Sequence, residues 1–151
     1  MVIINNFIIK LLKEYNNKIK IKINKHWILF GDEYEIPESG YKIHISSIYS
    51  NSINTLNNIV YILLDCNYIF KIPNSDNVLK KILTENNGLI NGKMITIYPR
   101  DYTEFIDLLF KLEKIKEIHC SDFIYIKGDF QYKNTCIFYR KFEVNSNGEH
   151  C

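Results

Sequence analysis

One short stretch of the sequence places a cation and an imidazole where both can reach the same ligand. From Gly40 to Ser46 apolar and polar residues alternate, which predicts a strand with Lys42 and His44 on one face. An ammonium group binds anions, and an imidazole gives or takes a proton near neutral pH. The pair is therefore a candidate binding site for a single ligand, although lysine and histidine also occupy the solvent-exposed face of many surface strands.

Two further segments place a basic residue at or near the end of a predicted strand, beside a turn. Phe70-Lys71 closes one strand, and Gly92-Lys93 opens another that leads to Arg100. The glycines and asparagines before Lys93 predict either a sharp turn whose backbone N–H groups face an anion or a plain surface loop. Together with the first stretch, these segments predict a basic cleft.

Residue periodicity predicts the elements that must position these side chains. The predicted helices cover residues 4–16, 53–64, 76–83 and 101–112, and the predicted strands cover residues 18–23, 27–30, 40–46, 68–72, 93–98, 123–126 and 136–139. Lysines alternate with isoleucines in the first strand, which is typical of a protected sheet edge, and Asp101 or Thr103 can cap the last helix. A strand, a helix and a strand within about thirty residues favour a βαβ-like unit or an α+β layer. We expect one compact α+β domain with a mixed or antiparallel sheet packed against helices.

Composition limits the class of partner. The chain has 151 residues, of which 46% are hydrophobic and 24% charged, as expected for one globular domain. A net charge of +2 is too small to predict a nucleic-acid partner, and no apolar run approaches the ~20 residues that span a membrane. We expect a cytoplasmic location, a domain over residues 1–143, and a linker or disordered tail over residues 144–151.

The cysteines and the remaining histidines do not predict a metal site. The four cysteines are Cys66, Cys120, Cys136 and Cys151, with no C-x-x-C pair and no cluster of histidines to complete a zinc site. We expect reduced thiols and no bound metal. His26 and His119 are expected to have structural or surface roles.

Four segments in this order and spacing resemble a known enzyme family. They are Ile36-Pro37-Glu38-Ser39-Gly40-Tyr41-Lys42-Ile43-His44-Ile45-Ser46, Phe70-Lys71, Gly92-Lys93 followed by Ile97-Tyr98-Pro99-Arg100-Asp101, and Tyr139-Arg140. From about Pro37 to Arg140 the chain is similar to the phosphoserine/phosphothreonine lyase domain of class III and class IV lanthipeptide synthetases. It more distantly resembles the bacterial effector phosphothreonine lyases, which implies their α+β fold. Lys141-Phe142 departs from the family's usual Y-R-Y-G pattern, and the loop before Gly92 lacks the arginine of many relatives.

The resemblance implies a bacterial lyase that acts on a phosphorylated precursor peptide. Such a domain removes phosphate by β-elimination from phosphoserine or phosphothreonine, without metal or other cofactor, and leaves dehydroalanine or dehydrobutyrine. In intact synthetases it is followed by a kinase domain and a cyclase domain in the same chain. This sequence has no H-R-D or D-F-G kinase motif, so we expect either an excised lyase domain or a stand-alone lyase.

The resemblance also implies roles for individual residues. Lys71 is the base that removes the α-proton, His44 is the acid that protonates the departing oxygen, Lys42 stabilises negative charge, and Tyr98 supports them. A lysine with a pKa of about 10.4 is neutral in only about one molecule in 2,500 at pH 7, so the pKa of the base must fall. Burial and neighbouring cations act in that direction.

The candidates for binding the phosphate are Lys93, Arg100 and Arg140. Arg100 can alternatively pair with Asp101 or Glu104 at the surface. Two other readings of the chain stay open: a module that binds a phosphopeptide or a leader peptide without catalysis, and a small structural domain without a site.

Overall fold

The computed structural model of the protein describes residues 3–84, 88–120 and 122–143, so the predicted tail over residues 144–151 lies outside the described residues. The described residues form four α-helices: α1 (Ile3–Tyr15), α2 (Ser52–Asp65), α3 (Asp76–Ile82) and α4 (Tyr102–Glu113). They also form seven strands: β1 (Ile21–Ile23), β2 (Trp27–Phe30), β3 (Ser39–Ile45), β4 (Phe70–Pro73), β5 (Ile95–Ile97), β6 (Phe130–Gln131) and β7 (Ile137–Glu143). Short 3₁₀ turns include η1 (Glu33–Glu35) and η3 (Gly88–Ile90).

The seven strands form one sheet in the order β1-β2-β4-β5-β3-β7-β6, and every neighbouring pair is antiparallel. The expected α+β domain is therefore confirmed, with an antiparallel sheet. Strands β3 and β4 run parallel to each other and are joined through α2, but β5 lies between them. The predicted strand–helix–strand unit is thus split by a strand that comes later in the chain.

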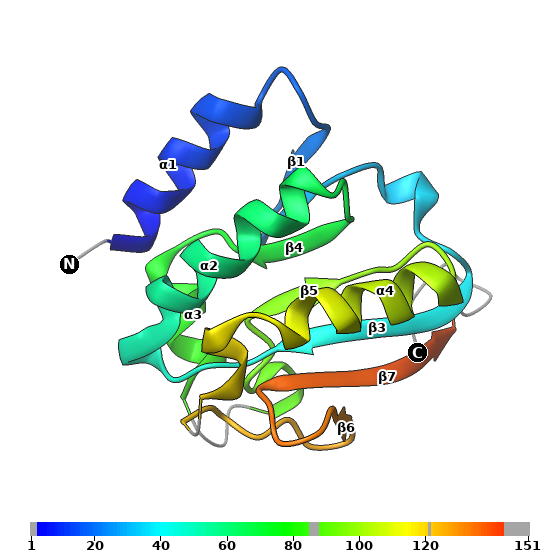
Figure 1. The fold of residues 1–151 in the computed structure, drawn as a ribbon. Helices are drawn as coiled ribbons and strands as arrows, with labels where there is room; N and C mark the ends of the chain where they lie inside the picture. Colours follow the sequence, from blue (N-terminus) through cyan, green and yellow to red (C-terminus); the bar gives the residue numbers. More distant parts are fainter. Residues whose placement is uncertain (1–2, 85–87, 121, 144–151) are drawn as a thin grey trace.

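One face of the sheet carries the helices and the hydrophobic core. Helices α2 and α4 lie across the same face (Figure 1). The ring of Tyr41 in β3 stacks on Phe105 in α4 with centroids 4.7 Å apart, and Ile43 and Ile45 are fully buried on the same side. The alternation in the sequence therefore predicted the direction of these side chains correctly. Of the two residues predicted to cap α4, Asp101 is the cap, because its Oδ1 accepts a hydrogen bond from the Glu104 N–H at 2.8 Å.

The opposite face of the sheet carries the basic residues, and strand pairing sets them side by side. Thr96 of β5 is paired with Lys71 of β4 on one side and with His44 of β3 on the other. Lys42 of β3 is paired with Arg140 of β7. Because directly paired residues in antiparallel strands point to the same face, the sheet itself gathers these side chains.

The segment between α4 and β7 corrects one prediction. Residues 123–126 form no strand, although their apolar character predicted one. The segment instead crosses the basic face, where Phe123 and Tyr125 pack edge-on against Phe138. Its backbone meets the end of β3 through the N–H of Ile124, which donates to the Ser47 carbonyl at 3.2 Å. The apolar residues thus serve side-chain packing rather than a strand ladder, and the closing hairpin is made by β6 and β7.

The described cysteines Cys66, Cys120 and Cys136 are free thiols, as predicted. Among the described residues, no helix combines the length and the apolar character needed to cross a membrane.

Candidate functional site

A cleft of about 220 Å³ opens on the basic face of the sheet, where β2, β4, β5 and β3 lie side by side. It is lined by Trp27, Lys42, His44, Lys71, Ile90, Lys93, Thr96 and Tyr98. All four residues predicted to be catalytic are therefore brought together, with one of the predicted phosphate-binding residues beside them. Most of them come from strands, which fix side chains more rigidly than loops do.

His44 is held by a buried carboxylate. Its Nδ1 lies 2.5 Å from Oδ2 of Asp129, and the two side chains are 2% and 0% exposed. Burial lowers the pKa of His44 to about 4, while the hydrogen bond and the charge of Asp129 act in the opposite direction. Because Nδ1 faces Asp129, Nε2 is the ring nitrogen left to serve the cleft.

Lys71 lies near two aromatic rings and near other cations. Its Nζ is 4.7 Å from the ring centroid of Trp27 and 5.8 Å from that of Tyr98. Burial lowers the pKa of Lys71, and the charge of Lys93 lowers it further. The shift is in the direction that a lysine base requires.

The neighbouring cations perturb one another. Burial, followed by the charges of Arg140, Lys93 and Lys71, lowers the pKa of Lys42 to about 8. Burial also lowers the pKa of Lys93, and the charge of Arg140 adds to that effect while Asp129 opposes it. At pH 7 a lysine with a pKa of about 8 is still charged in about nine molecules of ten, so Lys42 serves as a cation.

Burial raises the pKa of Tyr98 to about 12, so its phenol keeps its proton at neutral pH. The ring is 5% exposed and packs edge-on against Phe142 on β7, which holds it at the wall of the cleft.

A larger pocket of about 560 Å³ adjoins the cleft, and Lys93 lines both. The pocket is lined by Gly88, Asn91, Lys93, Ile126, Lys127, Gly128 and Arg140. Gly92 permits the tight turn at its wall: its φ is +81°, and a Cβ there would lie 2.8 Å from the Ile124 carbonyl oxygen. The cations that line the two hollows are Lys42, Lys71, Lys93, Lys127 and Arg140.

The cations of the two hollows have no carboxylate partner in the described part of the chain. None of Lys42, Lys71, Lys93 and Arg140 forms an ion pair there, and Asp129, the one acidic group that acts on them, is committed to His44. An uncompensated group of cations in partly buried surroundings favours an anionic ligand.

Arg100 does not line either hollow. Its Nε donates to Glu35 at 2.7 Å, and its Nη1 donates to Glu104 at 3.1 Å and to the Asn67 carbonyl at 2.9 Å. The alternative pairing with Glu104 is therefore observed, whereas Asp101 caps α4 instead.

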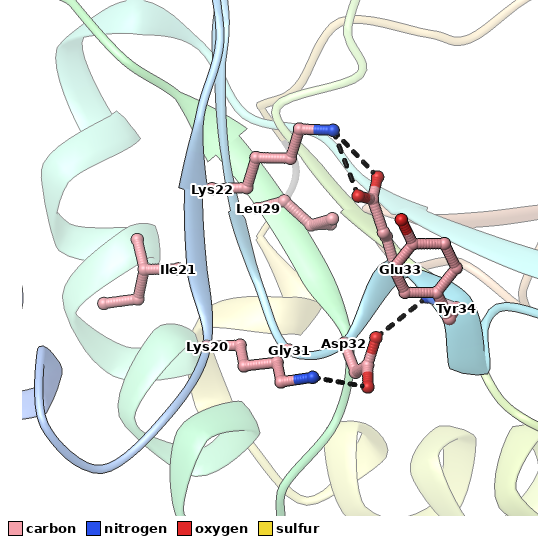
Figure 2. A pocket seen from close by; sticks show the side chains of 8 residues that line it. All are labelled: Lys20, Ile21, Lys22, Leu29, Gly31, Asp32, Glu33 and Tyr34. Atoms are coloured by element: carbon pink, nitrogen blue, oxygen red, sulfur yellow. Dashed lines mark hydrogen bonds and ion pairs between the residues drawn. The ribbon is translucent and has the colours of Figure 1, made fainter.

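A further pocket of about 300 Å³ lies where β1 and β2 meet η1 (Figure 2). Its lysines, unlike those of the basic cleft, form ion pairs with carboxylates. Its two lysines are both paired: Lys20 Nζ lies 3.0 Å from Asp32 Oδ2, and Lys22 Nζ lies 3.0 Å from Glu33 Oε2. Because each cation already has a carboxylate, this pocket is a weaker candidate for binding a phosphate than the basic cleft.

Sequence reasoning did not assign Thr96 or Trp27 to the cleft, and it did not identify Asp129 as the partner of His44. Asp129 gave only the weak signal of a polar residue after Gly128, Thr96 looked like any other strand residue, and Trp27 was assigned only to a strand. Strand geometry places Trp27 on the same face as Leu29, but β2 is apolar throughout, and only the structure shows that Leu29 is paired with Lys71.

The described residues contain no group of three or more His, Cys, Asp or Glu side chains that could hold a metal ion. A comparison with protein families matches residues 10–143 to the family described as RamC, N-terminal domain. Curated proteins give no significant match.

Proposed function

The chain belongs to the family of RamC N-terminal domains, and from this premise we propose that it is a phosphoserine/phosphothreonine lyase that acts on a lanthipeptide precursor. The observation that carries the proposal is the register Lys71–Thr96–His44 across three neighbouring strands. It aligns a lysine of lowered pKa and an oriented histidine on one face, beside unpaired cations. β-Elimination requires those components: a base, an acid, and positive charge for the phosphate.

Phosphate binding falls to the cations that have no carboxylate partner. A phosphoserine carries a charge of about −1.5 to −2 at pH 7. Lys93 lines both hollows, and Arg140 lies in the larger one, so the pair can hold the phosphate at their junction. This position leaves the Cα and Cβ of the phosphoresidue over the smaller cleft.

Lys71 then acts as the base. In its neutral form the amine takes the proton from Cα, and burial together with Lys93 increases the neutral fraction. Lys42 remains mostly charged at pH 7 and stabilises the negative charge that develops on the substrate carbonyl oxygen.

His44 completes the reaction as the acid. A pKa of about 4 leaves its imidazole neutral in the empty cleft, but a phosphate dianion near Nε2 favours the imidazolium, which Asp129 also stabilises. As the Cα–H electron pair forms the C=C bond and the Cβ–O bond breaks, Nε2–H gives its proton to the departing oxygen. The products are a dehydroamino acid, hydrogenphosphate, a Lys71 ammonium and a neutral His44.

The proposal is tested by incubating the protein with a phosphoserine peptide in EDTA and following peptide mass. We expect the wild type to release phosphate and leave a dehydrated peptide, whereas Lys71→Met and His44→Ala leave the peptide unchanged. Lys80→Ala is the matched control, because Lys80 is a surface lysine paired with Asp76. Circular dichroism of each variant establishes that its fold is intact.

Two outcomes would count against a metal-free lyase. If the wild type binds the phosphopeptide but never eliminates phosphate, the module that binds without catalysis is the better description. If elimination occurs only without EDTA, the metal-free reaction is wrong.

A further inference from the structure

A tryptophan outside the segments that resemble the lyases lies against the amine of Lys71. Trp27 is the first residue of β2, and the pairing of β2 with β4 puts it on the face that Lys71 shares. The 4.7 Å between Nζ and the ring centroid of Trp27 is the shortest cation–π distance among the described residues. Tyr98 presents a second ring at 5.8 Å.

The aromatic rings are the neighbours of Lys71 that can attract its positive charge. Within the described residues no carboxylate forms an ion pair with Lys71, and the charges of Lys42 and Lys93 repel a positive Nζ. An aromatic face attracts a cation through its quadrupole, most strongly for tryptophan and where water is excluded. The indole is therefore placed to stabilise an ammonium that the rest of the cleft disfavours.

We propose that Trp27 is a positioning residue, which holds Nζ of Lys71 beside the indole and stabilises the positive charge that the amine gains with the proton. The inference rests on the proposed function for the identity of that proton. As the Cα–H bond breaks and the N–H bond forms, charge grows on Nζ, so the attraction to the ring is stronger in the transition state than in the complex with the neutral amine. Trp27 thereby raises the limiting kcat reached above the pKa of Lys71, whereas below that pKa the same contact lowers the fraction of neutral amine.

The test compares Trp27→Leu, which removes the ring, with Trp27→Phe, which keeps a weaker one. A cation–π contact of about 1 to 2 kcal/mol corresponds, above the pKa of Lys71, to a fall in the limiting kcat of at most about 5- to 30-fold for Trp27→Leu. The acid limb of the pH profile of kcat/KM should move about 0.7 to 1.5 pH units toward lower pH, because the ammonium is less stable. Trp27→Phe should lie between the wild type and Trp27→Leu in both measurements.

A structural role alone would lower the rate and leave the acid limb in place, and that result would overturn the inference. The control is Tyr49→Leu, which removes the ring under Lys80, 5.6 Å from its Nζ and remote from the cleft. It should change neither kcat nor the acid limb. If circular dichroism shows that Trp27→Leu does not fold, the test uses Trp27→Phe alone. An acid limb of kcat/KM that moves to lower pH in this variant supports the inference, and an unmoved limb overturns it.

A second readout separates this inference from the proposed function. Competitive acetylation of the lysines at several pH values, read by mass spectrometry, follows the titration of Lys71 without any substrate. A midpoint that falls in Trp27→Leu and recovers partly in Trp27→Phe supports the contact even if the wild type eliminates no phosphate. An unchanged midpoint overturns it even if the wild type is an active lyase.

Discussion

Replacing Asp129 with asparagine should separate catalysis from stability. The Asp129 carboxylate binds Nδ1 of His44 at 2.5 Å, and both side chains are buried. The asparagine amide has nearly the same shape but no charge, so it stabilises the imidazolium less. A hydrogen bond to a charged group contributes about 1.5 to 3 kcal/mol, which corresponds to a fall in kcat of about 10- to 150-fold.

Stability should respond far less than the rate. Oδ1 of Asp129 is buried and has no hydrogen-bond partner among the described residues, so the folded protein already contains an incompletely satisfied carboxylate. The substitution exchanges that charged oxygen for a neutral amide group. We expect the free energy of unfolding to change by no more than about 1 kcal/mol in either direction.

The assay is the initial rate of dehydrated-peptide formation, with urea unfolding of the same preparations. Asp122→Asn is the matched control, because Asp122 lies on the same segment and is exposed. The reasoning is refuted if Asp129→Asn keeps its rate within about twofold, or if its loss of rate follows its loss of folded protein.

Three further predictions follow from the charges described above. Arg100→Met should lower the free energy of unfolding by about 1 to 2 kcal/mol in urea titrations, because the hydrogen bonds to Glu35, Asn67 and Glu104 are lost. It should leave kcat/KM within about twofold, and a large rise in KM would instead indicate that Arg100 binds the phosphate. Since the pKa of Lys42 is lowered to about 8, kcat/KM should fall more steeply as pH rises above that value and Lys42 loses its charge. Lys42→Arg should remove this additional fall and leave the one that deprotonation of His44 causes at lower pH. In the unfolded chain His44 binds a proton below about pH 6.5, whereas in the folded protein it does so only below its pKa of about 4. The free energy of unfolding of the wild type should therefore decrease between these two pH values, by about 3 kcal/mol in total. Urea unfolding of His44→Gln, which lacks this group, should not show that decrease.

Local patterns were sufficient to predict the direction of the key side chains. Period two along β3 placed Lys42 and His44 together and away from the helices, because one face of that strand had to enter the core. The cap of α4 by Asp101 was also predictable from the sequence, since the hydrogen bond that forms it joins residues only three positions apart.

Contacts between segments far apart in the sequence could not be predicted from local patterns. Asp129 reaches His44 across 85 positions of sequence, through a segment whose path is set by Phe123 and Tyr125 packing on β7. The same apolar residues produced the wrong strand at 123–126, because burial alone does not distinguish side-chain packing from a ladder. The place of β5 between β3 and β4 is likewise a property of the whole sheet.

The insertion of β5 also determines when the site comes into existence during folding. Strands β3 and β4 are joined by α2 early in the chain, yet they run parallel with a gap that only β5 fills. Until Thr96 is in place, Lys71 and His44 belong to two separate unpaired edges. The pairings of β5 join Thr96 to Lys71 and to His44, which are remote in the sequence, so the two edges come together only when both non-local pairings have formed. A partly folded chain therefore has no base facing an acid, and the domain gains its site in the step that closes its sheet.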